Sequence, residues 1–201
     1  TPRAELPFAG HPSLGTAWCL GPERWEQTTE GGMVVVEADA VGATMTQPTP
    51  RFTYADPDPG VAALGLAGAE VASVAEAGGV RHLILATDAP LEHLSPDPAE
   101  VAAVAAQVSA HTVCAVRALD GATLHVRVFA PLLGIAEDPG TGAAAGPIGL
   151  LARRLWGTGV DLSILQGAEL GRSCRIEVHA DEADVRVGGR VAACAEGTFT
   201  L

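Results

Sequence analysis

Residues 137–142 read Glu-Asp-Pro-Gly-Thr-Gly and lead into an apolar segment that we expect to be helical as far as about Trp156. A segment of the same design lies near the start of the chain, where residues 8–12, Phe-Ala-Gly-His-Pro, lead into an apolar stretch that ends at Leu20. Each is a loop of small residues that runs into the N-terminus of an apolar helix. The first helix is short and apolar on most sides, so we expect it to be buried. This weak internal repeat predicts two similar units.

Two residues beside these helices could carry chemistry. A helix N-terminus offers free backbone N–H groups and the positive end of the helix dipole, so two that face each other would bind an anion such as a carboxylate. His11 stands at the first N-terminus, either as a hydrogen-bond donor or proton carrier, or as a surface or capping residue. Asp138 precedes the second helix, either as a capping acid or as a carboxylate that orients a ligand or relays a proton.

The rest of the chain contains many strands and few helices. A break of alternating Asp and Pro at residues 55–60 predicts a hinge or domain linker, because proline holds a chain extended. Since strands do not alternate strictly with long helices, the pattern favours an α+β fold, with mixed sheets that each cover a helix, over a doubly wound parallel sheet. We expect strands at 33–37, 43–47, 51–54, 71–75, 82–87, 112–118, 123–129, 162–166, 175–180, 185–187 and 198–201, and a further helix from 97 to about 107.

Composition excludes several classes of function. The 201 residues are 48% hydrophobic, and 24 acidic side chains against 12 basic ones give a net charge of −12, which argues against a nucleic-acid or anionic membrane partner. All the basic side chains are arginine, so no lysine Schiff base or P-loop lysine can form. We find no targeting or membrane-spanning segment and predict a cytoplasmic protein.

Neither a metal nor a cofactor is expected. The four cysteines, at positions 19, 114, 174 and 194, are widely spaced and include no Cys-x-x-Cys pair, so they predict small core residues in a reducing compartment rather than zinc ligands. The glycines at 140 and 142 do not form the longer glycine fingerprint of a dinucleotide site.

Taken together, four blocks resemble the PhzF family, the phenazine-biosynthesis isomerases and their relatives. The resemblance implies a fold like that of diaminopimelate epimerase, with two similar domains, each a mixed sheet wrapped around a central helix, and a site in the cleft between them. That agrees with the two loop-helix units. The blocks, in family order, are residues 5–12 (Glu-Leu-Pro-Phe-Ala-Gly-His-Pro), 127–131 (Arg-Val-Phe-Ala-Pro), 137–142 and 166–172 (Gln-Gly-Ala-Glu-Leu-Gly-Arg).

The family's site residues carry over by position. Gly10 and His11 match a glycine-histidine pair that lines the pocket, and Asp138 matches the aspartate of the second loop. Gly142, after Thr141 in that loop, matches a backbone contact to the substrate carboxylate. The resemblance therefore implies that His11 and Asp138 are catalytic and that Gly10, Thr141 and Gly142 bind substrate.

Two further positions, Ala143 and His82, are also expected to bind substrate from the comparison with the family. The phenazine enzymes usually have serine after the last glycine of the second loop, whereas this chain has Ala143, so that hydroxyl contact is absent. His82 matches a family histidine that follows a glycine-rich turn. From its own context His82 is either a satisfied core residue or a lining residue of the pocket.

The largest departure is at the start of the chain. In the family, a further segment precedes the block at Glu5 and carries a Ser-Glu-Thr type motif whose glutamate is the main general acid/base. No such motif occurs in this sequence, so we expect residues 1–55 to be an incomplete N-terminal domain and residues 56–195 to be the C-terminal domain. The strand at 196–201 is expected to pair with the first domain. Fold relatives that racemise with two thiols carry a cysteine in each loop; neither loop here has one, so the cysteines are expected to be inert.

Two functions remain open from the sequence. The first is a PhzF-like isomerase of secondary metabolism that moves a proton on a small carboxylic acid without a cofactor. The second is a non-catalytic carboxylate-binding or accessory protein, or one chain of a split enzyme. The expected partners are the acid substrate and either a second copy of the chain or a separate chain that carries the missing glutamate.

Overall fold

The computed structural model describes residues 1–198, and a twelve-stranded sheet runs through the whole of it. The strand order is β1-β2-β3-β12-β11-β10-β8-β7-β6-β5-β4, and β9 pairs with β8 outside this path. The helices are α1 (Gly10–Leu20), α2 (Pro57–Leu64), α3 (Pro98–Gln107) and α4 (Gly142–Trp156), with short 3₁₀ turns η1 (Pro131–Leu133) and η2 (Ala168–Leu170). The strands are β1 (Arg24–Thr29), β2 (Gly32–Ala38), β3 (Gly42–Gln47), β4 (Arg51–Ala55), β5 (Val71–Ala77), β6 (Val80–Ala86), β7 (Thr112–Ala118), β8 (Thr123–Ala130), β9 (Ile135–Asp138), β10 (Asp161–Gln166), β11 (Cys174–Ala180) and β12 (Val185–Arg190).

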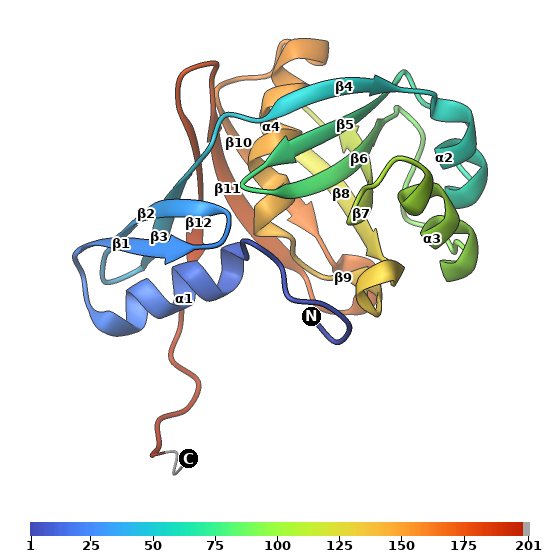
Figure 1. Cartoon of the computed structure of the whole chain (residues 1–201). Coiled ribbons are helices and arrows are strands. Elements are labelled where there is room, and N and C mark those ends of the chain that lie inside the picture. The colour runs from blue at the N-terminus through green and yellow to red at the C-terminus, as the bar shows by residue number, and fades with distance from the viewer. Residues whose placement is uncertain (199–201) are drawn as a thin grey trace.

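The sheet curves around two helices, as the sequence predicts. Helix α1 packs on β2 and β3, while α4 lies between β11 and β12 on one side and β5, β6 and β7 on the other (Figure 1). Residues 142–152 of α4 are all buried, because they are small or apolar all around the helix. The glycines of α4 allow the strands to come close: a Cβ at Gly149 would lie 2.8 Å from a methyl carbon of Val178. Helix α4 is therefore the centre of the larger of the two loop-helix units, which comprises α4 and the strands packed around it.

Helix α1 is covered on one face only. Its buried residues are Gly10, Ser13, Leu14 and Ala17, which face β2 and β3. The opposite face is exposed, and Leu20 keeps 59% of its surface accessible. The prediction that this helix is buried is wrong for that face, because Thr16, Cys19 and Leu20 are exposed there.

Helices α2 and α3 cover the outer face of β5, β6 and β7 and form a second core with them, seen on the right of Figure 1. The predicted extended linker at 55–60 is wrong, because α2 begins inside it. The Asp56 carboxylate accepts a hydrogen bond of 3.1 Å from the backbone N–H of Asp58 and so caps the helix. Pro57 and Pro59 lie in the first turn, where a missing N–H costs no intrahelical bond. The proposed division at 55/56 stays a prediction.

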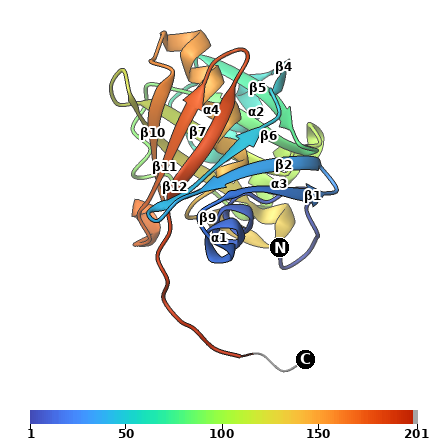
Figure 2. The same cartoon turned by 90° about the vertical axis from the view of Figure 1, so that its left-hand side faces the viewer.

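Strand β12 joins the two ends of the chain. It pairs with β11 on one side and with β3 on the other, where Val187 lies opposite Met45. Residues 196–198 are exposed and form no strand, and the segment after β12 leaves the body of the molecule in Figure 2. Since β2 and β12 already occupy both edges of β3, that strand has no free edge for a further strand. Residues 199–201 of the predicted C-terminal strand lie outside the described residues. Within residues 1–198, no helix is both long and apolar enough to cross a membrane.

Candidate active site

The N-termini of α1 and α4 lie against each other. A Cβ added to Gly10 would be 3.1 Å from the Cα of Gly142 and 2.9 Å from the Cε of Met45, so only glycine allows this approach. Neither N-cap residue, Ala9 or Thr141, caps its helix with its side chain. Two positive helix ends are thus brought together, and such an arrangement favours an anion.

Asp138 is held by the loop that leads into α4. Its carboxylate accepts hydrogen bonds from the Thr141 hydroxyl at 2.7 Å and from the Gly140 N–H at 3.4 Å. The buried side chain of Gln166 fixes the same loop: its amide donates to the Asp138 carbonyl at 2.7 Å and to the Thr141 hydroxyl oxygen at 3.1 Å. Its carbonyl oxygen accepts from the Thr141 N–H at 3.1 Å. The Thr141 side chain is therefore committed to orienting Asp138.

His11 and Asp138 line the same hollow, which has a volume of about 740 Å³. A Cβ at Gly140 would lie 3.0 Å from the Cε1 of His11, so the exposed imidazole stands next to the second loop. A second hollow of about 270 Å³ is lined by His11 and Gly142 together with residues of β11 and β12. His11 therefore lies between the helix ends and the larger hollow.

Cys174 lies at this site, outside both loops. The prediction that the cysteines are core residues is right for Cys114 alone, because Cys174 is half-buried and Cys19 and Cys194 are exposed. Cys174 lines both hollows, and a Cβ at Gly140 would lie 2.8 Å from its sulfur. Burial, and then the charge of Asp138, raises the pKa of the Cys174 thiol, so the group is a neutral thiol. The strand register explains its position, because Cys174 lies opposite Gln166 across the β10–β11 hairpin. Since strand register sets this position, no local sequence pattern could have located Cys174.

His82 lies behind the site rather than in it. The side chain is fully buried on β6, and its Nδ1 is 2.8 Å from the Thr112 hydroxyl. Burial, with a smaller contribution from His111, lowers the pKa of His82 to about 3, while the backbone of Ala143 opposes that shift. His82 is thus a neutral imidazole beside the first turn of α4, and it lines neither hollow.

Two arginines of the site suit an acidic ligand. Arg172 lines the larger hollow and Arg190 the smaller one, and neither forms an ion pair within residues 1–198. The same part of the chain contains no cluster of three or more His, Cys, Asp or Glu that could hold a metal ion. Burial also raises the pKa of Cys114 to about 12, which agrees with an inert core thiol.

Comparison with known proteins places this chain in a family. The model of the PhzC-PhzF family, described as "Phenazine biosynthesis-like protein", matches residues 1–197. The trans-2,3-dihydro-3-hydroxyanthranilate isomerase of Pseudomonas aeruginosa is 37% identical over 227 residues, an alignment that covers 100% of this chain and 77% of that protein. The isomerase of the same name from Pseudomonas chlororaphis is 35% identical over 222 residues, with the same coverage. The chain therefore belongs to the PhzC-PhzF family.

Solved structures confirm the predicted fold. A PhzF-family phenazine biosynthesis protein from Bacillus anthracis superposes with a TM-score of 0.75 at 19% identity, covering 96% of this chain and 77% of that one. A hydroxyproline epimerase from Agrobacterium vitis gives a TM-score of 0.60 at 15% identity, covering 94% and 65%. The architecture is thus shared with PhzF proteins and with epimerases, and function must be argued from the site.

Proposed function

We propose that this protein is an isomerase, as its relatives' names suggest, and that it moves a proton on a small carboxylic acid without a metal or cofactor. The substrate carboxylate lies against the first turns of α1 and α4, at Gly10 and Gly142. Asp138 and His11 face the substrate from the larger hollow. The contact between Gly10 and Gly142 carries the proposal, because it joins two uncapped helix N-termini beside both titratable side chains.

The chemistry needs only acid/base groups. A base removes a proton from one carbon, the electron pair left behind shifts the double bond, and the proton returns to another carbon. Substrate and product are therefore isomers, and no oxidant or reductant is needed. The helix dipoles stabilise the negative charge that develops during this step. In this proposal the principal base is a glutamate from a segment outside residues 1–201, as the family resemblance implies, and His11 and Asp138 pass the proton. Ala143 leaves the carboxylate without the serine hydroxyl found in the phenazine enzymes.

Proton exchange in deuterated water tests the proposal. The protein is incubated with trans-2,3-dihydro-3-hydroxyanthranilate, alone and with a chain that carries the family's glutamate segment, and proton NMR follows solvent deuterium into the substrate. In the sample with the added chain we expect deuterium incorporation together with a shifted double bond. The rate should be at least about 100-fold lower in Asp138→Asn. His93→Gln, at an exposed position outside both hollows, is the matched control and should keep the wild-type rate.

Complete absence of exchange in both samples would rule out the isomerase. Tight carboxylate binding without exchange would instead identify a binding protein. A cytoplasmic location and assembly with a second copy or a segment-bearing chain stay predictions.

A further inference from the structure

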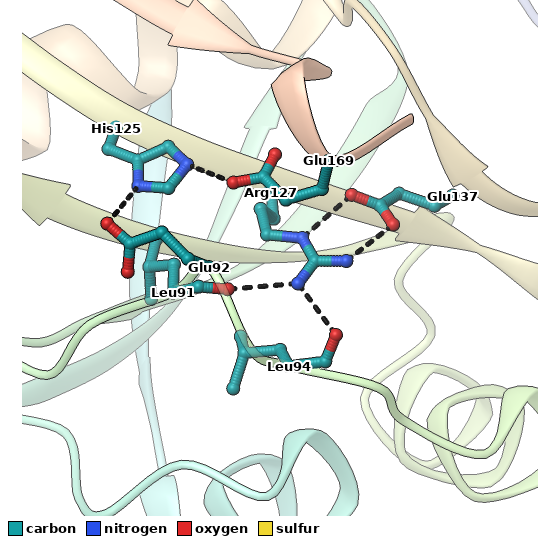
Figure 3. A network of polar contacts seen from close by, with 7 residues as sticks. All are labelled: Leu91, Glu92, Leu94, His125, Arg127, Glu137 and Glu169. Carbon is teal, nitrogen blue, oxygen red and sulfur yellow. Dashed lines mark hydrogen bonds and ion pairs between the residues drawn. The ribbon is translucent and has the colours of Figure 1, made fainter. Parts of the chain in front are cut away.

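Arg127 makes the most extensive set of buried contacts outside the helix ends. It lies on β8 with 5% of its side chain exposed, and its Nε and Nη2 donate to the two Glu137 carboxylate oxygens at 2.8 and 2.7 Å (Figure 3). Its Nη1 donates to the carbonyls of Leu91 and Leu94 at 2.9 and 2.7 Å. A bidentate pair with two further acceptors fixes the guanidinium plane in one orientation.

The partner of Arg127 is the residue before Asp138. Both acids belong to β9, where successive side chains point to opposite faces, so Glu137 turns to Arg127 while Asp138 turns to the Gly140–Thr141 loop. The backbone holds β9 weakly: it pairs with β8 only at Val128–Asp138 and Ala130–Ile135, with an irregularity between them. The direction of Asp138 therefore depends on side-chain contacts.

A second anchor stands two residues earlier on β8. The Nε2 of His125 is 2.8 Å from a Glu169 carboxylate oxygen, and its Nδ1 is 3.9 Å from Glu92 (Figure 3). Glu169 lies just after Gln166, whose side chain holds the Asp138 loop. Two side chains on one face of β8 thus hold the surroundings of Asp138. Arg127 contacts β9, the strand that carries Asp138, and His125 contacts the turn after β10.

We propose that Arg127 is a positioning residue for the reaction: by holding Glu137 it fixes the direction in which Asp138 presents its carboxylate to the substrate. The inference rests on the proposed function, because it assigns Asp138 a role in proton transfer. A displacement of about 1 Å at a reacting group can cost on the order of 100-fold in rate. Loss of the pair should therefore lower kcat and leave KM nearly unchanged, since the carboxylate is bound at the helix ends.

The test replaces the pair as a whole. Truncating Arg127 alone would leave a buried, unpaired glutamate and could unfold the protein, whereas an apolar pair of similar volume is often tolerated. We therefore compare Arg127→Met/Glu137→Leu with a matched surface pair, Arg154→Met/Glu182→Leu. Arg154 resembles Arg127 in two respects: it pairs with its glutamate through two nitrogens, and it lies over an aromatic ring, that of Phe52, as Arg127 lies over Phe129. Its side chain, however, is 40% exposed.

For the buried pair we expect a melting temperature near the wild-type value, kcat at least about tenfold lower, and KM within about twofold. In the Asp138→Asn background, the same double replacement should cause no further loss of kcat, since the two changes act through one carboxylate. The amide NMR signals of Gly140 and Thr141 should also shift without any substrate present. The surface pair should change none of these values.

Each result decides a separate question. If Asp138→Asn lowers kcat but the buried-pair variant keeps wild-type kcat and unshifted Gly140 and Thr141 signals, the positioning role is wrong and the proposed function stands. Losses that multiply independently in the Asp138→Asn background overturn the positioning role as well. If Asp138→Asn itself keeps full activity, the catalytic assignment of Asp138 fails first, and the inference falls with it.

Discussion

The two loops that lead into α1 and α4 look alike in sequence but are held very differently. The loop before α4 is fixed by Gln166, by the Asp138–Thr141 hydrogen bond and by the Arg127–Glu137 pair. The loop before α1 has one side-chain hydrogen bond near its end, from the Ser13 hydroxyl to the Ala9 carbonyl at 2.9 Å. Similar loop-helix units thus provide one rigid wall of the site and one lightly held wall.

The largest expected difference between the units is in their cores. Leu150→Ala, at a fully buried position of α4, should lower the free energy of unfolding by about 2–5 kcal/mol, because it leaves a cavity in an enclosed helix. Leu20→Ala on the exposed face of α1 should change it by less than about 0.5 kcal/mol. Urea unfolding of both variants measures this, and equal losses would contradict the comparison.

The contact between the helix ends can be broken from the α1 side. Gly10→Ala should cost about 1–3 kcal/mol, since its Cβ would press on the Gly142 backbone and force the helices apart. Gly15→Ala on the same helix meets nothing within 4 Å and should stabilise the protein by up to about 1 kcal/mol. Thermal unfolding compares the two variants, and a stabilised Gly10→Ala would show that the helix ends are not in contact.

His82 provides a pH test of burial in the larger unit. Its pKa is about 3 in the folded protein against an ordinary value of 6.5, so between pH 3 and pH 6.5 the unfolded chain binds a proton that the native protein does not. Stability therefore falls as pH falls from 7, and at pH 5 this one group should remove about 2 kcal/mol. Denaturant titrations should show that His82→Gln lacks this part of the pH dependence and that the exposed-site variant His93→Gln keeps it.

The smallest expected effect is a change in the labelling rate of one cysteine. Iodoacetamide should modify the exposed Cys19 and Cys194 first, Cys174 more slowly, and Cys114 only after unfolding. A carboxylate ligand should slow the reaction of Cys174 alone, because that thiol lines both hollows. Peptide mass spectrometry follows each site, and equal protection of Cys19 would place the ligand elsewhere.

The sequence predicts most of the α4 unit because its signals are local. The small-residue loop, the apolar helix after it and the strands predicted at 112–118 and 123–129 all appear in short stretches. The missed elements depend on distant partners. Strand β9 exists because residues 135–138 meet β8, and the polar strand β1 has only the β2 edge to pair with.

The site residues also differ in whether a local sequence signal or a distant partner determines them. Gly10, His11, Asp138 and Gly142 are found from their two loops, and the structure brings them together. Cys174 and the Arg127–Glu137 pair depend on strand register and burial, which no local pattern reports. The prolines after Asp56 mislead because the same residues suit an extended linker or a first helical turn, and the capping carboxylate decides between them.

The pairing of β3 with β12 also constrains how the chain acquires its structure. Gly42 lies opposite Arg190 in this pairing, so the sheet beside α1 has very high contact order. On the ribosome, β1, β2 and β3 emerge long before β12, and the edge of β3 that pairs with β12 stays unpaired until β12 has been synthesised. The α4 unit can assemble most of its strands earlier, so we expect α1 and its strands to be the last part protected from hydrogen exchange during refolding.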